Sequence, residues 1–419
     1  MDRYIFHIDV NSAFLSWEAT RRVQEGEDDL RLVPSIIGGD PGSRTSIVAA
    51  KSIPAKKYGI VTGEPVASAM KKCPGLIVAP SDFKLYIKCS KAFKAICQEY
   101  SPLMESFSID EVFLDMSGMG RIYPDLEETA YVIKNRIRDE LGFTVNVGIG
   151  KNKLCAKMAS DFLKPDNVHT LYPEEIPAKM WPLPVGELFT CGRASARVLE
   201  NAGIKTIGDL AKTDVEYLKV LIGDKGGEHL WRYANGIDDS EVTPEHEAAK
   251  SYSIDTTVEE DITDLETASR ILKAQADIVA SRLRADEARC RCVSVTWRTL
   301  DFKNHSHQKN LYNATDVTSE IYETALGLLK ESWKGQPLRL LSTSLSNVDH
   351  GEDDFEQLSL FDDGSKEKMK KLDLALDSIR GRYGNSSVMR AGLMDDPASR
   401  SMGRKHKAQG EEKCMHQSE

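Results

Sequence analysis

Two adjacent acids stand at the start of an apolar run in SFSIDEVFLD, residues 106–115. Neighbouring side chains of a strand point to opposite faces of a sheet, so Asp110 and Glu111 cannot both be ordinary surface charges on one half-buried sheet. Short β-rich runs, LMESF and VFLDM, lie on either side of the acids. We therefore expect a hairpin with Ser108, Asp110 and Glu111 at its tip, where at least one acid is aimed at a positive group.

A third acid, Asp9, stands near the end of YIFHIDV, residues 4–10, which we predict to be the central strand of the same sheet. AFLSWEATRRV, residues 13–23, predicts a helix directly after it. Three carboxylates that converge at one sheet edge repel each other unless cations neutralise them. Oxygen-only ligation suits Mg²⁺, and a pair of such ions can hold the attacking and leaving oxygens of an in-line phosphoryl displacement.

Lysines follow a further predicted strand, VNVGIG at residues 145–150. In KNKLCAKMASDFLKP, residues 151–165, the spacing places Lys153, Lys157 and Lys164 on one face of a helix that ends at its proline. Lys56, after a predicted strand pair at SIIGG and SIVAA, is a second source of positive charge. Lys56 and Lys164 are candidates to hold a triphosphate as point charges, although a solvated surface lysine is the simpler interpretation of either one alone.

The second half of the chain changes character after a proline-rich boundary at residues 172–184. Short helices follow, with capping boxes predicted at TIGD, residues 206–209, and TDVE, residues 213–216. From Lys250 the pattern predicts strand, helix, strand, strand, helix and strand, the order of a β-α-β-β-α-β unit. The expected ranges are 251–257, 265–284, 292–300, a strand near 311, 316–331 and 338–345.

Composition limits the partners and the compartment. The formal net charge of -10 and the pI near 5.6 argue against a simple basic coat for nucleic acid but allow local basic grooves. The eight cysteines include no C-x-x-C pair, so they indicate reduced thiols rather than a zinc site. No signal peptide or membrane span is evident, and we expect a cytoplasmic monomer that has no membrane contact.

Three motifs resemble those of the Y-family translesion DNA polymerases, in particular the bacterial polymerase IV and polymerase V types. They are HIDVNSAF at residues 7–14, SIDE at residues 108–111, and VGIGKNK at residues 147–153 continuing to Lys164 and Pro165. The resemblance covers about the first 350 residues. It implies an α+β multidomain fold, a right-hand polymerase with palm, fingers, helical thumb and a β-α-β-β-α-β little-finger domain. The implied boundaries are palm 1–25 and 75–168, fingers 26–74, a helix-hairpin-helix-like thumb 169–240, little finger 245–348, and a clamp-binding linker and tail 349–419.

The resemblance also implies the roles of the acids and of the segment after Asp9. Asp9, Asp110 and Glu111 would be the catalytic acids and would hold two Mg²⁺ ions, with the Val10 carbonyl as a further metal ligand. Glu111 would lie nearest the primer 3′-hydroxyl. Backbone N–H groups at the start of the next helix would bind the triphosphate, which the positive end of a helix favours. These groups belong to Asn11, Ser12, Ala13 and Phe14.

Phe14 would in addition be the steric gate, because a bulky ring under the sugar collides with a ribose 2′-hydroxyl. The alternative is a core phenylalanine on an amphipathic helix, which is the commoner place for a lone Phe.

Two segments depart from the family pattern. Where polymerase IV relatives carry Tyr and Arg in the fingers, this chain has Ile53 and Lys56, in the style of polymerase V. FTCGR, residues 189–193, lacks the usual G-V-G or G-I-G of a helix-hairpin-helix and keeps only Gly192 for backbone contact with DNA phosphates. The grip on DNA is then expected mainly from phosphate contacts of the little finger, with a solvated charged face as the alternative. The candidate residues are Lys250, Arg289, Arg291 and Arg298.

QLSLF, residues 357–361, resembles the peptide with which bacterial polymerases bind the sliding clamp. Leu360 and Phe361 are apolar side chains in an otherwise acidic linker, and they need a partner. With Gln357 and Leu358 they are expected to bind the clamp and to raise the effective concentration of the chain at the primer terminus. Beyond this peptide we expect order at residues 378–384 and disorder after Pro397.

The leading hypothesis is a template-directed DNA polymerase, a nucleotidyltransferase that adds deoxynucleotides from their triphosphates to a primer 3′ end. Low-fidelity translesion synthesis in DNA damage tolerance is implied by the resemblance alone. One alternative is a non-catalytic, clamp-bound scaffold of a mutagenesis complex, against which the three intact acids speak. Another is a palm-type nucleotidyl transferase or cyclase that acts without a template, which the additional domains disfavour.

Overall fold

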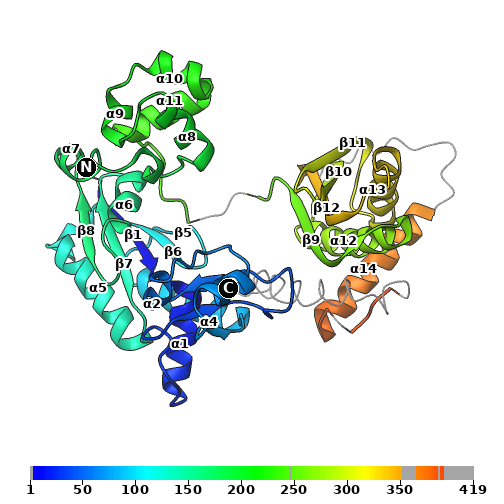
Figure 1. Ribbon diagram of the computed structural model, residues 1–419, viewed down its shortest axis with the longest axis horizontal. Coiled ribbons are helices and arrows are strands. Elements are labelled where there is room, and N and C mark those ends of the chain that lie inside the picture. The colour runs from blue at the N-terminus through cyan, green and yellow to red at the C-terminus, as the bar shows by residue number, and fades with distance from the viewer. Residues whose placement is uncertain (1–2, 245–247, 352–364, 386, 391–419) are drawn as a thin grey trace. The chain divides into compact units, whose positions relative to one another are not determined.

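The computed structural model describes residues 3–244, 248–351, 365–385 and 387–390 (Figure 1). The chain divides into two compact units, one formed by Met1–Gly42 and Ser46–His246 and the other by Ser43–Thr45 and Glu247–Glu419. Each unit has a hydrophobic core of its own. Within the described ranges, none of the helices has the length and apolar character needed to cross a membrane.

The first unit is built around a five-stranded sheet in the order β5-β6-β1-β7-β8. β1 is the central strand, as predicted, and all of its side chains are buried because helices cover both faces of the sheet. Phe6 and Ile8 pack into the core with α1, α4 and α5, whereas α6 covers the opposite face. The strands are β1 (Ile5–Val10), β5 (Met104–Ser106), β6 (Glu111–Asp115), β7 (Val145–Gly150) and β8 (Val168–Leu171); the helices are α1 (Ala13–Gln24), α4 (Phe83–Gln98), α5 (Leu126–Leu141) and α6 (Lys153–Ser160).

The contact between α6 and β7 is so close that it requires glycine. A Cβ atom on Gly148 would lie 2.0 Å from the carbonyl oxygen of Ala156, and one on Gly150 would lie 2.6 Å from the backbone nitrogen of the same residue. Side chains cannot occupy these positions without moving the helix. The glycines of VNVGIG therefore place α6 directly on the strands that carry the acids.

The helix that carries the lysines is shorter than the predicted range 151–165. It ends at Ser160, because the buried side chain of Asn146 donates to the carbonyl oxygens of Ser160 and Leu163, at 3.1 and 2.8 Å, and holds the following residues out of the helix. Lys164 lies on the loop after it, where the Lys164–Pro165 peptide is cis. The prediction that Lys164 shares a helical face with Lys157 is therefore wrong.

A three-stranded sheet in the order β3-β2-β4 has a small core of its own, with Ile36, Val48 and Ile60 buried. Its strands are β2 (Ser35–Ile37), β3 (Ala50–Lys51) and β4 (Ile77–Ala79), so the strand expected at SIVAA is formed only at its end. Ser52 then caps the short helix α2 (Ile53–Lys56) by accepting from the backbone N–H of Ala55 at 3.1 Å. The helix α3 (Val66–Lys72) completes this part of the unit.

Short helices follow β8, as the sequence predicts. The capping box at TIGD is confirmed, because the Thr206 hydroxyl accepts from Asp209 N at 3.0 Å and the Asp209 carboxylate accepts from Thr206 N at 2.9 Å. The box at TDVE is wrong, since Thr213 donates its hydroxyl back to the Asp209 carbonyl and Asp214 caps the next helix instead. The helices are α7 (Ile176–Lys179), α8 (Arg193–Asn201), α9 (Ile207–Lys212), α10 (Val215–Ile222) and α11 (Asp224–Ala234), with 3₁₀ turns at Met119–Arg121, Pro173–Glu175 and Val185–Glu187.

The second unit confirms the predicted β-α-β-β-α-β order. Its antiparallel sheet has the order β11-β10-β12-β9, and one face packs against α12 and α13 through side chains such as Val293, Val295 and Leu341. The elements are β9 (Tyr252–Ile262), α12 (Leu265–Ala285), β10 (Arg289–Thr299), β11 (Asn304–Thr315), α13 (Thr318–Ser332) and β12 (Leu338–Asp349). A further helix, α14 (Ser365–Tyr383), contacts α13 and is much longer than the ordered segment expected at residues 378–384 (Figure 1).

Candidate active site

A cavity of about 500 Å³ opens where the strands that carry the acids meet the start of α1 and the small sheet. Nine of the predicted site residues line this cavity. They are Asp9, Val10, Ser12, Ala13, Phe14, Lys56, Asp110, Glu111 and Lys164. Segments more than a hundred positions apart in the sequence thus contribute to one site, as the predicted sheet requires.

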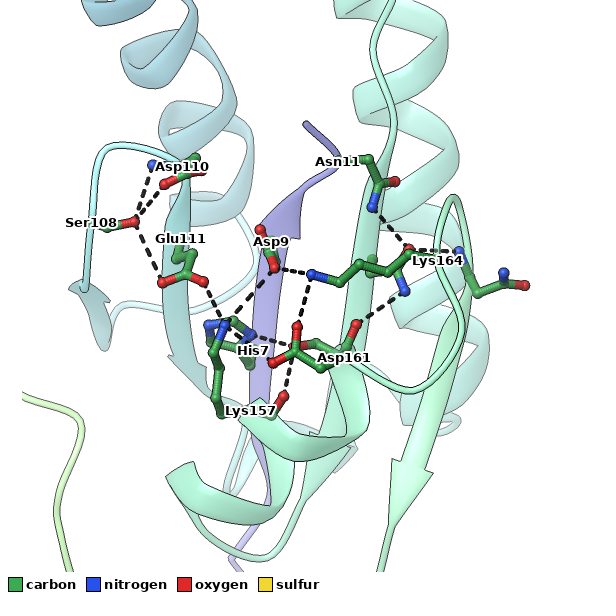
Figure 2. A network of polar contacts seen from close by, with 12 residues as sticks. His7, Asp9, Asn11, Ser108, Asp110, Glu111, Lys157, Asp161 and Lys164 are labelled. Atoms are coloured by element: carbon green, nitrogen blue, oxygen red, sulfur yellow. Dashed lines mark hydrogen bonds and ion pairs between the residues drawn. The ribbon is translucent and has the colours of Figure 1, made fainter. Parts of the chain in front are cut away.

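Strand register brings the acids together. Asp9 and Glu111 are directly paired residues of the antiparallel strands β1 and β6, so their side chains lie on the same face of the sheet. Asp110 lies at the hairpin tip, where its carbonyl accepts from Val10 N at 3.0 Å and its carboxylate accepts from the Ser108 hydroxyl at 2.7 Å. Figure 2 shows the three carboxylates at adjacent strand ends. The predicted hairpin with acids at its tip is confirmed.

Two lysines neutralise the paired acids (Figure 2). The Lys157 ammonium donates to Glu111 Oε1 at 2.5 Å and lies 3.9 Å from Asp9 Oδ2. The Lys164 ammonium donates to Asp9 Oδ2 and lies 2.8 Å from Asp161 Oδ1. Lys157 and Asp161 were not predicted as site residues, although the four-residue spacing between Lys153 and Lys157 was a signal for the first of them.

Burial and charge act in opposite directions on this cluster. Burial raises the pKa of Asp9 to about 6, against the opposing effect of Lys164 and Lys157. Burial also disfavours the charged forms of Lys157 and Lys164, but Asp9 and Asp161 raise the pKa of both ammonium groups overall. The lysines therefore stay charged, whereas Asp9 takes up a proton in mildly acidic solution.

The donor set fits a hard cation in its chemistry. Asp9, Asp110 and Glu111 supply carboxylate oxygens and Val10 a carbonyl at one end of the cavity. Within the described part of the chain, no three His, Cys, Asp or Glu side chains are already arranged around one point as a closed metal site. In this structure Glu111 and Asp9 are instead paired with the ammonium groups of Lys157 and Lys164.

The start of α1 faces the same cavity. Ser12 has the left-handed backbone conformation, with a φ angle of 48°, and turns the chain sharply from β1 into the helix. Ser12, Ala13 and Phe14 line the cavity, and the first turn of a helix has backbone N–H groups with no intrahelical partner. An anion in the cavity would find these donors at the positive end of the helix.

Asn11 must be removed from the predicted set. Its backbone N–H already donates to the carbonyl oxygen of Thr144 at 3.0 Å, and its side chain is buried. The side-chain amide donates to Asn146 Oδ1 at 3.1 Å and its oxygen accepts from the backbone N–H of Asp166 at 3.0 Å. Asn11 therefore ties the end of β1 to the neighbouring segments and has no backbone donor left for a triphosphate.

Phe14 lies at the boundary between the core and the cavity. Its ring stacks on Tyr86, with centroids 4.5 Å apart and planes 10° apart, and also contacts Phe83 and Trp17. Tyr86 and Trp17 are fully buried, so these contacts fix the orientation of the Phe14 ring. Phe14 thus packs on core aromatic rings and also lines the cavity, and its role as a steric gate stays a prediction.

The wall formed by the small sheet carries two cations. Lys56 on α2 was predicted, but Lys51 on β3 lines the cavity as well. Burial lowers the pKa of Lys51, and the nearby Lys56 lowers it further. Ile53, interpreted above as a departure from the family pattern, lines the cavity with an apolar side chain that is 56% exposed.

The predicted DNA contacts lie outside this cavity. Gly192 is the N-cap residue of α8, and Lys250 precedes β9. Arg289, Arg291 and Arg298 lie on β10, where Arg298 donates to Asn304 Oδ1 at 2.7 Å. The clamp peptide, Gln357, Leu358, Leu360 and Phe361, lies outside the described residues.

Comparisons with known proteins agree with this architecture. Residues 8–161 match the model of the impB/mucB/samB family, residues 249–360 match that family's C-terminal domain, and residues 187–238 match the model described as DNA polymerase-iota, thumb domain. The chain is 47% identical over 396 residues to DNA polymerase IV of Clostridium acetobutylicum, covering 94% of this chain and 99% of the relative. It is 36% identical over 403 residues to DNA polymerase IV of Clostridium kluyveri, covering 94% and 99%.

A solved structure has the same fold. A Y-family DNA polymerase chimera of Dbh and Dpo4 aligns with a TM-score of 0.71 at 23% identity, covering 82% of this chain and 99% of the chimera.

The chain belongs to the Y family of translesion DNA polymerases, which are DNA-directed, metal-dependent nucleotidyltransferases. Among the members of this family it is similar to bacterial DNA polymerase IV along almost its whole length. The scaffold alternative has no support in these comparisons.

Proposed function

We propose that the cavity between the acids and the start of α1 is the site at which a deoxynucleoside triphosphate is joined to a primer 3′ end on template DNA. The observation that carries this proposal is the register of β1 and β6, which pairs Asp9 with Glu111 on one face beside Asp110. Lys51 and Lys56 line the same cavity, so it combines carboxylates with ammonium groups that the acids do not pair with. Such a pairing suits a substrate that bridges divalent cations and phosphates.

In this proposal Asp9, Asp110, Glu111 and the Val10 carbonyl hold two Mg²⁺ ions. The ions supply the positive charge that stabilises the attacking and leaving oxygens of an in-line displacement. Glu111 is next to the primer 3′-hydroxyl and orients it. With cations bound to the acids, Lys157 and Lys164 would be available to donate to phosphate oxygens.

The triphosphate is held from three sides. The free N–H groups at Ser12, Ala13 and Phe14 donate from the helix start, Lys164 donates from its loop, and Lys56 from the wall. Phe14 lies below the sugar, where its ring excludes a 2′-hydroxyl.

Primer extension with Asp110→Ala tests the catalytic assignment. A labelled primer on a defined template is extended with Mg²⁺ and each deoxynucleotide singly. The variant is expected to lose template-directed addition by at least about a thousandfold while still binding DNA, because only a metal ligand is removed. Asp139→Ala, which removes an exposed acid on α5, is the matched control. Equal extension by the Asp110 variant and the parent would end the assignment.

Phe14→Ala tests the steric gate. The variant is expected to incorporate ribonucleotides at least about tenfold better relative to deoxynucleotides, because the space of the ring is opened under the sugar. Single-nucleotide kinetics with both sugars measure the ratio. Unchanged sugar discrimination would leave Phe14 as a core residue only.

We further propose that the little finger contacts DNA phosphates and that residues 357–361 bind the bacterial sliding clamp. Arg298 supports the first point, because it lies on the sheet face opposite the core residues Val293 and Val295. That face carries mostly hydroxyl and amide side chains, among them Ser294, Thr296 and Gln308. The affinity of this face for DNA is therefore expected to fall less steeply with salt concentration than the affinity of a lysine-rich groove.

A further inference from the structure

The helix α14 is attached to the second unit through charged side chains. Asp377 accepts from Arg284 Nε on α12 at 2.7 Å, and Asp373 lies 3.4 Å from Nη1 of the same arginine. Arg380 donates to Asp277, also on α12, at 2.7 Å. Asp373 is only 2% exposed and Arg380 only 8%, so the face of α14 that meets the unit is both buried and ionic. Figure 1 shows α14 beside α12.

The apolar side chains of α14 lie on another face. Met369, Leu372, Leu376, Ile379 and Tyr383 follow one another at steps of three, four, three and four residues, the spacing of a coiled-coil seam. Four of them are between 40% and 75% exposed, and Leu376 is half-buried. Among the described residues, none of the five joins the hydrophobic core of the unit. A helix that docks through charges and leaves an apolar seam in solvent is the reverse of the usual arrangement.

The charge beside the seam limits what can cover it. In the heptad that places Met369 at position a, one flank of the seam consists of Asp373 and Arg380, which are engaged with α12. The other flank carries the exposed Lys368 and Arg382. An occupant that approaches from solvent meets the seam and these two positive charges together.

A second copy of the chain fits this surface poorly. In an antiparallel pair of α14 helices, Lys368 would face Arg382 of the other copy, and like charges at these positions destabilise a coiled coil. In a parallel pair, the basic flank would have to face the flank that α12 already covers. We propose that the seam of α14 is a docking surface for an amphipathic helix of a partner protein that carries apolar residues at its a and d positions and acidic residues on its flanks.

Binding of designed peptides to the full chain tests this proposal. One peptide of about three heptads has Leu at a and d and Glu at e and g, and a matched peptide has Lys at e and g. Fluorescence anisotropy should show saturable binding of the Glu peptide and at least about tenfold weaker binding of the Lys peptide. The double variant Leu372→Gln with Ile379→Gln should bind the Glu peptide at least about tenfold more weakly than the parent does. Leu374→Gln, which changes an exposed leucine outside the seam, should bind the Glu peptide as tightly as the parent.

Other outcomes would overturn the proposal. Equal binding of both peptides, or unchanged binding by the double variant, would remove the seam as the site. A dimer in sedimentation that the double variant dissociates would assign the seam to a second copy. If the Glu peptide binds only after residues 391–419 are removed, the occupant of the seam is that segment of this chain. Basal primer extension by all variants should equal that of the parent, which verifies that they are folded.

Discussion

Asp9 is a buried acid whose charge is tolerated because two lysines reach it. Its Cα register with Glu111 would force two negative charges together in a place where only 7% of the residue is exposed. The raised pKa, about 6, records that burial outweighs the attraction of Lys164 and Lys157. An acid kept in such a position at a cost in stability is typical of a functional site.

The raised pKa of Asp9 should make the stability of the chain depend on pH. The unfolded pKa of Asp9 is about 3.8 and the folded pKa about 6, so the folded chain binds more protons than the unfolded chain between these values. Stability contributed by protonated Asp9 is complete below pH 4 and is lost as the pH rises through 6. Asp9→Asn should therefore stabilise the metal-free chain at pH 7.5 by up to about 3 kcal/mol, and much less at pH 4. Urea unfolding with a chelator measures this, with Asp139→Asn as control; a less stable variant at pH 7.5 would contradict it.

Lys51 should matter for nucleotide binding although no motif marks it. It lines the cavity beside Lys56, and its lowered pKa reflects burial and the repulsion of that neighbour, which an anion between them would relieve. Lys51→Ala should raise the KM for deoxynucleotides about tenfold with a smaller change in kcat. Lys57→Ala is the matched control, because this lysine does not line the cavity. Equal KM values for Lys51→Ala and the parent would place the residue outside the substrate contacts.

At the scale of elements, sequence patterns predicted the strands and the hairpin, because neighbouring residues determine them. They did not predict features that depend on contacts between distant segments. The apolar run of β7 gave a strand with the expected bounds, and that of β1 gave one that begins one residue later than expected. The acids at the tip of β5 and β6 lie where the hairpin places them. The end of α6 depends on Asn146, whose hydrogen bonds to Ser160 and Leu163 join segments that no helical pattern relates. Asn11 is a similar case. Its backbone N–H donates to the carbonyl oxygen of Thr144, a residue far from it in the sequence, so no local pattern could predict this bond.

The close packing of α6 on β7 should be sensitive to a single methyl group. Gly148→Ala would place a Cβ 2.0 Å from the Ala156 carbonyl oxygen, so the helix that carries Lys157 must move. We expect a loss of about 2–4 kcal/mol in the free energy of unfolding and a parallel loss of activity.

Gly120→Ala is the control for this variant, because nothing lies within 4 Å of its added Cβ. Thermal and urea unfolding of both variants measure the difference. Equal stability of the two would mean that α6 can move away from β7 without cost.

At the scale of the whole molecule, the clamp peptide is expected to act as a tether. Replacing Leu360 and Phe361 by Ala should abolish stimulation of primer extension by the sliding clamp and leave basal extension unchanged, because tethering acts through effective concentration. Extension assays with and without a bacterial clamp measure this. A matched loss of basal activity would show that the residues serve the fold instead.

The ion pairs of the cavity have a consequence for handling the enzyme. Lys157 pairs with Glu111 and Lys164 pairs with Asp9, so two of the three acids keep a counter-charge when divalent cations are absent. We therefore expect a chelator to halt synthesis while the chain remains folded. We expect synthesis to return when Mg²⁺ is added back.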